Sequence, residues 1–108
     1  GLVELTRGPS GMMLIHRRVF ETLMKNRPDL EIQAHQHVDL FPEGFKIFSF
    51  WDCVFKDGKW TGDDIAFCNL ATENGFKLYA NIESEMVHHG GYGYKGRFGD
   101  GLMSKDEK

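Results

Sequence analysis

Residues 60–80, which read WTGDDIAFCNLATENGFKLYA, constrain the fold more than any other part of the chain. Thr61 followed three residues later by Asp64 is the Asp variant of the capping pattern that opens helices. Gly75 is the residue type that often follows the end of a helix, and the apolar run 76–80 predicts a strand directly after it. The side chains expected on the inner face of this helix are Ile65, Cys68, Ala71 and Thr72. The segment therefore predicts a helix joined by a short turn to a strand.

The N-terminal region predicts a second pair of this kind, with the strand first. The turn-forming residues 8–11 introduce a short apolar run over 11–17, which is typical of a buried strand. A helix is expected after it. This helix should end between Asn26 and Pro28, because the residue before a proline disfavours the helical conformation. The side chains expected on its apolar face are Val19, Phe20, Leu23 and Met24.

The remaining segments predict strands separated by polar connections. Beyond a polar excursion over residues 29–44, residues 45–55 are rich in aromatic and β-branched side chains and predict a strand. Residues 56–59, Lys-Asp-Gly-Lys, turn the chain. Residues 84–88 predict a last strand, and residues 101–108 a frayed polar terminus. The order of strand, helix, strand, helix and strand is typical of a layered α/β domain.

The composition indicates one globular domain and argues against several classes of protein. Of the 108 residues, 41% are hydrophobic and 13% aromatic, as in chains that form a core. The net charge of -3 provides no basic field, so we expect no nucleic-acid partner. No apolar run reaches the roughly 20 residues of a membrane span, so we expect no membrane contact either. Cys53 and Cys68 form no C-x-x-C motif, and we expect two reduced, buried thiols in a cytoplasmic protein.

Asp63 and Asp64 are adjacent carboxylates at the start of the expected helix, and two interpretations are open. Acidic side chains in a first turn stabilise a helix by complementing its dipole. A helix N-terminus can also direct one carboxylate into a cleft as a general base. Trp60 could form an apolar wall of such a cleft, or could lie in the core.

The histidines allow two interpretations as well. His88 and His89 end a strand, so only one of them can face a given site, where a neutral imidazole is a good ligand for a divalent metal. The other possibility is an ordinary surface histidine. His35 and His37 would share one face of an extended segment, but no cysteine or carboxylate lies near them at the spacing of a metal site.

Three blocks of the sequence resemble, in the right order, the C-terminal half of a GT-A-fold glycosyltransferase of the family-2-like type found in phages and bacteria. GPSGMMLIHRRVFETL, residues 8–23, resembles the family's turn, strand and helix start. Residues 60–80 are similar to a block in which Gly-Glu-Asp opens a helix and a glycine closes it. EMVHHGGYGYKG, residues 85–96, resembles the closing Leu-x-His-x-Gly segment. The resemblance covers residues 2–98 and implies an α/β partial GT-A fold, with helices packed on a mixed sheet.

The resemblance implies a role for each matching residue. Asp64 would be the general base that deprotonates the acceptor hydroxyl, although Asp63 stands where the family usually has Glu, so either carboxylate could reach the acceptor. His88 matches the family's histidine that helps to hold a divalent metal, Mn²⁺ or Mg²⁺, under the diphosphate of a nucleotide-sugar donor. The residues that would bind the substrate are Ser10, Gly11 and Trp60.

One departure from the family's pattern limits what the chain is expected to do alone. The family's Asp-x-Asp motif belongs to the nucleotide-binding half, and no two aspartates lie two residues apart here. Residues 1–100 are therefore expected to be the acceptor-side half of a truncated or split enzyme, inactive alone, with 101–108 as a polar tail. Exposed apolar surface would favour a homodimer of this half. Two alternatives stay open: a non-enzymatic binding or oligomerisation module, and an unrelated metal- or carbohydrate-binding α/β protein that uses His88.

Overall fold

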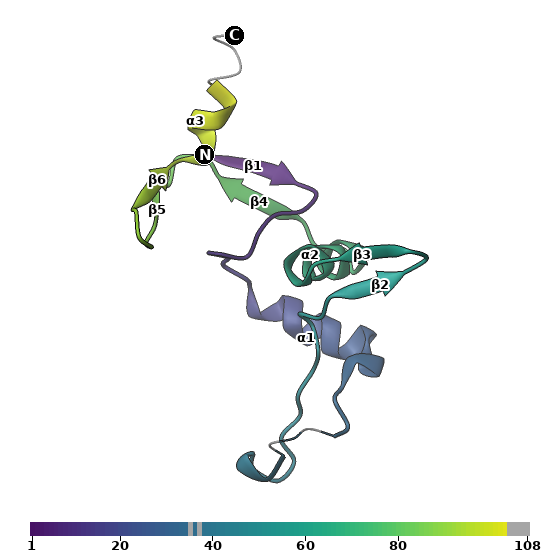
Figure 1. Ribbon diagram of the computed structural model, residues 1–108. Helices are drawn as coiled ribbons and strands as arrows, with labels where there is room; N and C mark the ends of the chain where they lie inside the picture. Colours follow the sequence, from purple (N-terminus) through teal and green to yellow (C-terminus); the bar gives the residue numbers. More distant parts are fainter. Residues whose placement is uncertain (35, 37, 104–108) are drawn as a thin grey trace. The chain divides into compact units, whose positions relative to one another are not determined.

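The computed structural model describes residues 1–34, 36 and 38–103 (Figure 1). The chain divides into two units: Thr6–Lys77 forms one, and Gly1–Leu5 together with Leu78–Lys108 forms the other. Helices alternate with short antiparallel strand pairs, which confirms the α/β class. Within the described ranges, no helix is both long and apolar enough to cross a membrane.

The unit Thr6–Lys77 combines helices with one β-hairpin. Its elements are α1 (Arg17–Asn26), η1 (Pro28–Leu30), η2 (Val38–Leu40), β2 (Val54–Lys56), β3 (Lys59–Thr61) and α2 (Asp63–Glu73). β2 and β3 pair antiparallel, and the turn between them places Asp57 and Gly58 at positive φ, 54° and 77°. Positive φ at both turn residues matches the twist of the two strands, so the Asp-Gly sequence forms the turn where it was predicted and joins the strands as a hairpin.

The core of this unit forms between α1 and α2. Leu23 and Cys68 are fully buried, and Phe67 is 2% exposed. Phe67 stacks on Trp51, with ring centroids 4.0 Å apart and planes 12° from parallel. Val19, Leu70 and Ala71 complete the buried cluster. The two helices therefore owe their stability to each other, because short isolated helices are marginal in water.

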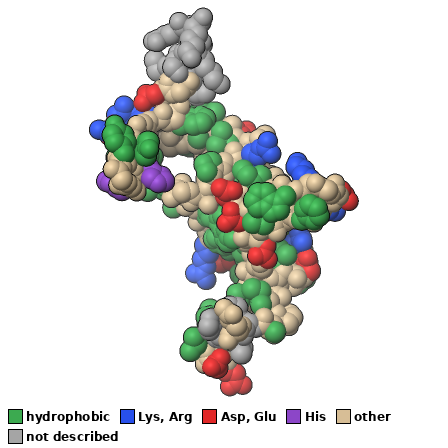
Figure 2. All heavy atoms as spheres, viewed as in Figure 1, with side chains coloured by type: hydrophobic (Ala, Val, Ile, Leu, Met, Phe, Trp, Pro, Cys, Tyr) green, Lys and Arg blue, Asp and Glu red, His purple; other side chains and the backbone are tan. Residues whose placement is uncertain are grey.

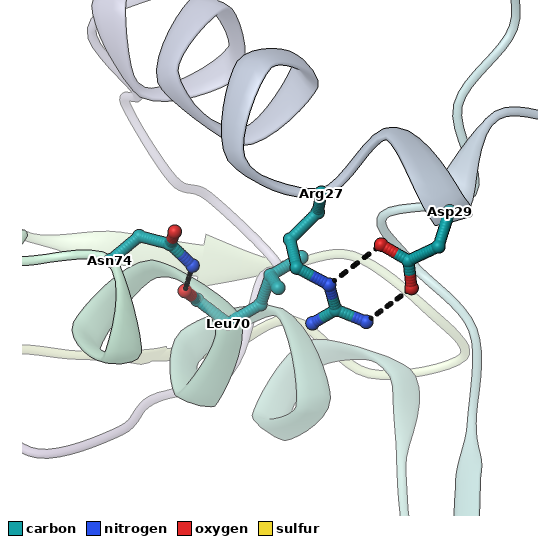
Figure 3. A network of polar contacts seen from close by, with 4 residues as sticks. All are labelled: Arg27, Asp29, Leu70 and Asn74. Atoms are coloured by element: carbon teal, nitrogen blue, oxygen red, sulfur yellow. Dashed lines mark hydrogen bonds and ion pairs between the residues drawn. The ribbon is translucent and has the colours of Figure 1, made fainter.

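Both helices end where the sequence predicts. The backbone N–H of Arg27 caps α1 by donating to the Leu23 carbonyl, and the chain then turns at Pro28. α2 ends at Glu73, and the Asn74 side chain donates to the Leu70 carbonyl at 2.7 Å (Figure 3). The side chain at the start of α1 is His16, whose Nδ1 accepts from the Arg18 N–H at 3.1 Å.

Gly75 follows α2 with φ +89°, a backbone conformation that side chains with a Cβ rarely adopt. Gly75→Ala is expected to destabilise the fold by about 1–2 kcal/mol, the cost of the left-handed conformation for an L-residue. Denaturant unfolding measures this change. Gly11→Ala is the control, because Gly11 has no positive φ and no atom lies within 4 Å of its added Cβ. Equal stabilities of the two variants would contradict the strain argument.

Arg27 and Asp29 form a two-pronged ion pair after α1 (Figure 3). Nε donates to Oδ1 at 2.9 Å and an Nη donates to Oδ2 at 2.8 Å. The hydrogen bonds from Arg27 hold the pKa of Asp29 below its ordinary value. The pair is a surface contact, so its contribution to the free energy of unfolding is small.

Replacing Asp29 by Asn is expected to reduce stability at neutral pH and to make no difference in strong acid. A carboxyl whose pKa is lower in the folded state stabilises the fold above its unfolded pKa. That stabilisation is lost as the pH falls through the folded pKa. Urea unfolding of both proteins at several pH values measures the difference. Glu43→Gln is the control, because it removes an exposed carboxylate that has no ion pair among the described residues. Its stability should differ from that of the unmodified chain by the same small amount at every pH.

The second unit consists of two strand pairs and a short helix. Its elements are β1 (Leu2–Leu5), β4 (Leu78–Asn81), β5 (Met86–His88), β6 (Tyr94–Gly96) and α3 (Phe98–Met103). β1 pairs with β4 and β5 with β6, both antiparallel. Glu85 holds the second hairpin through ion pairs with Lys95 at 3.1 Å and Arg97 at 3.2 Å.

Several strand predictions are wrong. Residues 11–17 form no strand: His16 is the N-cap of α1 and Arg17 its first residue, and Leu14 is fully exposed, because this apolar run has no pairing partner in the described structure. In residues 45–55, regular pairing is confined to Val54 and Phe55 at the end, with one isolated bridge from Phe48 to Glu31. The aromatic rings of this segment pack on one another and on α1 and α2 instead.

The expected mixed sheet is also absent from the described residues, where every strand pair is antiparallel. β1, β3, β6 and α3 were not predicted. Residues 101–103 belong to α3 and not to a frayed terminus, and the rest of the predicted tail, residues 104–108, lies outside the described residues.

Some side chains lie elsewhere than predicted. Met24 is 39% exposed, because it falls beside the buried face of α1 and not on it. Thr72 is exposed and donates its hydroxyl to carbonyls of its own helix. Both cysteines are free thiols, as predicted, but Cys53 is exposed because the segment before β2 does not form a buried strand.

Candidate functional site

Asp63 and Asp64 are the first two residues of α2. Asp63 Oδ1 accepts from the Asp64 N–H at 2.9 Å, and Asp64 Oδ1 accepts from the Ile65 N–H at 2.8 Å. Each carboxylate thus binds one of the free N–H groups of the first turn, where negative charge also complements the helix dipole. Within the described part of the chain, no hydrogen bond or ion pair reaches the second oxygen of either carboxylate. One oxygen of each remains open to a ligand.

The helix begins one residue later than predicted. Its N-cap is Gly62, with φ −65° and ψ 162°, and this glycine has no side chain to cap the helix. Thr61 is the last residue of β3, paired with Val54, so its hydroxyl does not serve as the cap. The carboxylates of Asp63 and Asp64 accept hydrogen bonds from N–H groups of the first turn instead. The capping pattern in the sequence therefore identified the helix but placed its start one residue too early.

Trp60 and Asp64 both lie close to Gly62. A Cβ placed on Gly62 would lie 3.6 Å from Cη2 of the Trp60 ring and 3.7 Å from Oδ1 of Asp64. Trp60 is 65% exposed, so its side chain lies on the surface and not in the core. An exposed indole and a carboxylate at a helix N-terminus therefore both border the position where a Cβ of residue 62 would lie. Because residue 62 is a glycine, no side chain occupies that position. This group, Trp60, Gly62 and Asp64, is the candidate site.

Ser10 and Gly11 lie in the loop before α1, in the same unit as the candidate site. Ser10 is half-buried and Gly11 exposed. The loop is tied to α2 two residues earlier, where the Cys68 thiol lies 3.4 Å from the Gly8 carbonyl oxygen. In the described structure, no hydrogen bond joins Ser10 or Gly11 to either aspartate, so the structure does not bring these predicted substrate-binding residues to the carboxylates.

His88 lies at the end of β5, in the second unit. It is directly opposite Tyr94 of β6, and the two rings meet edge to face with centroids 6.4 Å apart. Tyr92 in turn packs against Tyr94 at 5.2 Å. His88 and His89 are both exposed. His88 therefore belongs to an exposed aromatic cluster on the β5–β6 hairpin.

The described residues do not form a metal site on their own. No group of three or more histidine, cysteine, aspartate or glutamate side chains gathers among them. His88 offers one ligand and would need others from outside the described residues. His35 and His37, the other histidines considered as ligands, lie outside the described residues.

Phe55 is a candidate site residue that the sequence interpretation missed. It lies opposite Trp60 in the β2–β3 hairpin and is 74% exposed. The information was present, because the Asp-Gly turn sets the register of the hairpin and makes Phe55 and Trp60 partners. The other face of the hairpin carries an open depression of about 390 Å³, lined by Val54, Lys56, Asp57, Lys59 and Thr61.

Comparison with protein-family models, with curated proteins and with solved structures finds no match to this chain.

Proposed function

We propose that this chain is the acceptor-side part of a GT-A-type glycosyltransferase, which transfers a sugar from a nucleotide-diphospho-sugar to an acceptor hydroxyl. The observation that supports this most is that the Trp60 ring and Oδ1 of Asp64 both lie within 4 Å of the Cβ position of Gly62. An aromatic ring can hold the apolar face of a sugar. A carboxylate beside it can accept the proton of one of that sugar's hydroxyl groups.

The chemistry assigned to Asp64 is general-base catalysis. Its open oxygen accepts the proton from the acceptor hydroxyl while that hydroxyl's oxygen forms a bond to the anomeric carbon of the donor. The bond from that carbon to the diphosphate breaks, and the nucleoside diphosphate leaves with the electron pair. Asp63 lies one residue away with its own open oxygen and is the second candidate for the base.

The donor side of the reaction needs groups that this chain does not contain. No Asp-x-Asp occurs in the sequence, so the nucleotide and a divalent metal, Mn²⁺ or Mg²⁺, would be held mainly by a nucleotide-binding half. His88 would add one ligand from this chain. Bound metal would stabilise the charge of the departing diphosphate.

The coding DNA upstream of Gly1 and an assay of its product test the proposal. We expect an in-frame βαβ unit with Asp-x-Asp, and a product that releases nucleoside diphosphate from one nucleotide sugar when an acceptor is added. If the full product releases none with any donor and acceptor sugar tested, the proposal is wrong.

The second candidate function is a binding or oligomerisation module, and the open β1–β4 sheet favours it. This sheet has two strands, so its outer edges are unpaired among the described residues, and Leu2 and Tyr79 are 70% and 53% exposed. Unpaired edges and apolar side chains are typical of surfaces that pair with another chain. A second copy is the simplest partner, which gives a homodimer.

Replacing Val3 by Pro tests that surface. Val3 pairs with Ala80 inside the sheet, and a proline removes a backbone donor from β1. If dimers form through this sheet, the variant should sediment as a monomer where the unmodified chain sediments as a dimer. Val54→Pro, in the other unit, is the control and should leave the oligomeric state unchanged.

A further inference from the structure

The β2–β3 hairpin presents two bare aromatic rings on one face. Phe55 and Trp60 are direct cross-strand partners, and their side chains are 74% and 65% exposed. Directly opposite residues in an antiparallel pair have Cβ atoms about 5 Å apart and project from the same face. The two side chains therefore project from the same face of the hairpin, and we call them the hairpin platform.

The charges of the hairpin lie on its other face. Lys56 and Lys59 are partners in the neighbouring pair, so alternation along the strands turns them away from the platform. At the Trp60 end, Oδ1 of Asp64 lies 3.7 Å from the Cβ position of Gly62, the same position that the Trp60 ring borders at 3.6 Å. Figure 2 shows hydrophobic side chains over the hairpin with acidic side chains beside them. The platform is thus apolar along its length and bounded at one end by a hydrogen-bond acceptor.

The chain's two tryptophans differ in what they contact. Trp51 is 37% exposed and stacks on the buried Phe67, so one face of its ring is covered by a core side chain. Trp60 has its ring 3.6 Å from the Cβ position of Gly62 and otherwise faces outward. Packing in this unit therefore leaves both Trp60 and Phe55 exposed on the same face of the hairpin.

We infer that the hairpin platform binds two successive sugar units of an oligosaccharide, with Trp60 under the unit whose hydroxyl faces Asp64 and Phe55 under the next. A pyranose ring has an apolar C–H face that stacks on an aromatic ring and a rim of hydroxyl groups that a carboxylate can accept from. The Cβ atoms of two opposite cross-strand residues lie about 5 Å apart, which is of the order of one sugar unit. This inference rests on the proposed function and makes it more specific: the acceptor is an oligosaccharide, and Phe55 determines its minimum length.

A protein partner fits the platform less well. Each strand of the hairpin has three residues, and its aromatic face consists of one side chain per strand. Such a face is much smaller than the roughly 800 Å² that each partner buries in a stable protein interface. A carbohydrate, which binds through one ring contact per sugar, needs no larger surface.

Glycan binding by the chain, without donor or metal, tests the inference. The probes are an array of mono- and tetrasaccharides of glucose, galactose, mannose and N-acetylglucosamine, followed by calorimetry with the best tetrasaccharide. We expect a tetrasaccharide to bind more tightly than its monosaccharide. Phe55→Ala should weaken the tetrasaccharide about tenfold, the size of one good aromatic contact, and leave the monosaccharide unchanged. Phe55→Tyr should restore binding.

Val54→Ala is the matched control, because Val54 lies next to Phe55 but on the other face, and it should bind the tetrasaccharide normally. Circular dichroism melts check that each variant folds. Three results would overturn the inference: no tetrasaccharide bound more tightly than its monosaccharide, Phe55→Ala binding as the unmodified chain does, or Phe55→Ala turning a dimer into monomers. Tetrasaccharide binding without sugar transfer by the complete enzyme would instead reject the proposed function and leave the platform standing.

Discussion

Replacing Asp64 by Asn is expected to lower kcat by about 10²- to 10⁴-fold, the contribution of a positioned general base. This expectation rests on the proposed function, under which the enzyme to be assayed is this chain together with a nucleotide-binding half that supplies Asp-x-Asp. Asparagine keeps the shape of the side chain, and its Oδ1 can still accept from the Ile65 N–H as Asp64 does at 2.8 Å. The helix start is therefore preserved while the proton acceptor is lost. Donor binding, measured separately by calorimetry, should not change.

Asp63→Asn is the matched control for this experiment. Asp63 makes the same kind of contact, accepting from the next N–H at 2.9 Å, so both substitutions disturb the helix start alike. Asp63 is exposed, whereas Asp64 is half-buried and borders the point that Trp60 also borders. A large loss of kcat is thus expected for Asp64→Asn only. If Asp63→Asn shows the larger loss, the base is Asp63, and if neither affects kcat, neither carboxylate is the base.

Local patterns predicted the helices well because the residues that decide a helix are neighbours in sequence. The proline at 28 and the glycine at 75 lie at the ends of α1 and α2, as the sequence indicates. Strands depend on a partner that is distant in sequence. Residues 11–17 and 45–55 have the right composition for strands, but composition does not supply a partner. β1 and β4 are separated by more than 70 residues in the sequence, and no local pattern near Leu2 predicts that they pair.

The same contrast explains which parts of the candidate site were predictable. Trp60, Asp63 and Asp64 are close in sequence, so their placement at one helix start follows from local structure. His88 belongs to a different unit from Asp64, and only the resemblance to glycosyltransferases links the two. The exposure of Trp60 was not predictable, because tryptophan side chains are more commonly buried in the core. The register of the hairpin decides it.

Phe67→Ala is expected to destabilise the unit Thr6–Lys77 by about 3–5 kcal/mol, the usual cost of truncating a buried Phe. Phe67 occupies the centre of the core: it is 2% exposed, stacks on Trp51, and lies 6.0 Å from the ring of Phe20. Its removal leaves a cavity between α1 and α2 and deprives Trp51 of its stacking partner. Whole domains are stable by only about 5–15 kcal/mol, so this single change removes a large part of the total.

Urea unfolding followed by tryptophan fluorescence measures the effect, and Phe55→Ala is the control. Both variants lose the same side chain, but Phe55 is 74% exposed, so its loss should change the free energy of unfolding by less than about 0.5 kcal/mol. Phe67 also lies three residues after Asp64 in the block that resembles glycosyltransferases, where a reduced activity could be mistaken for a catalytic role. A Phe67→Leu variant separates the two explanations, because it refills much of the cavity. Activity that returns together with stability would assign Phe67 to the support of α2, and restored stability without activity would assign it to the site.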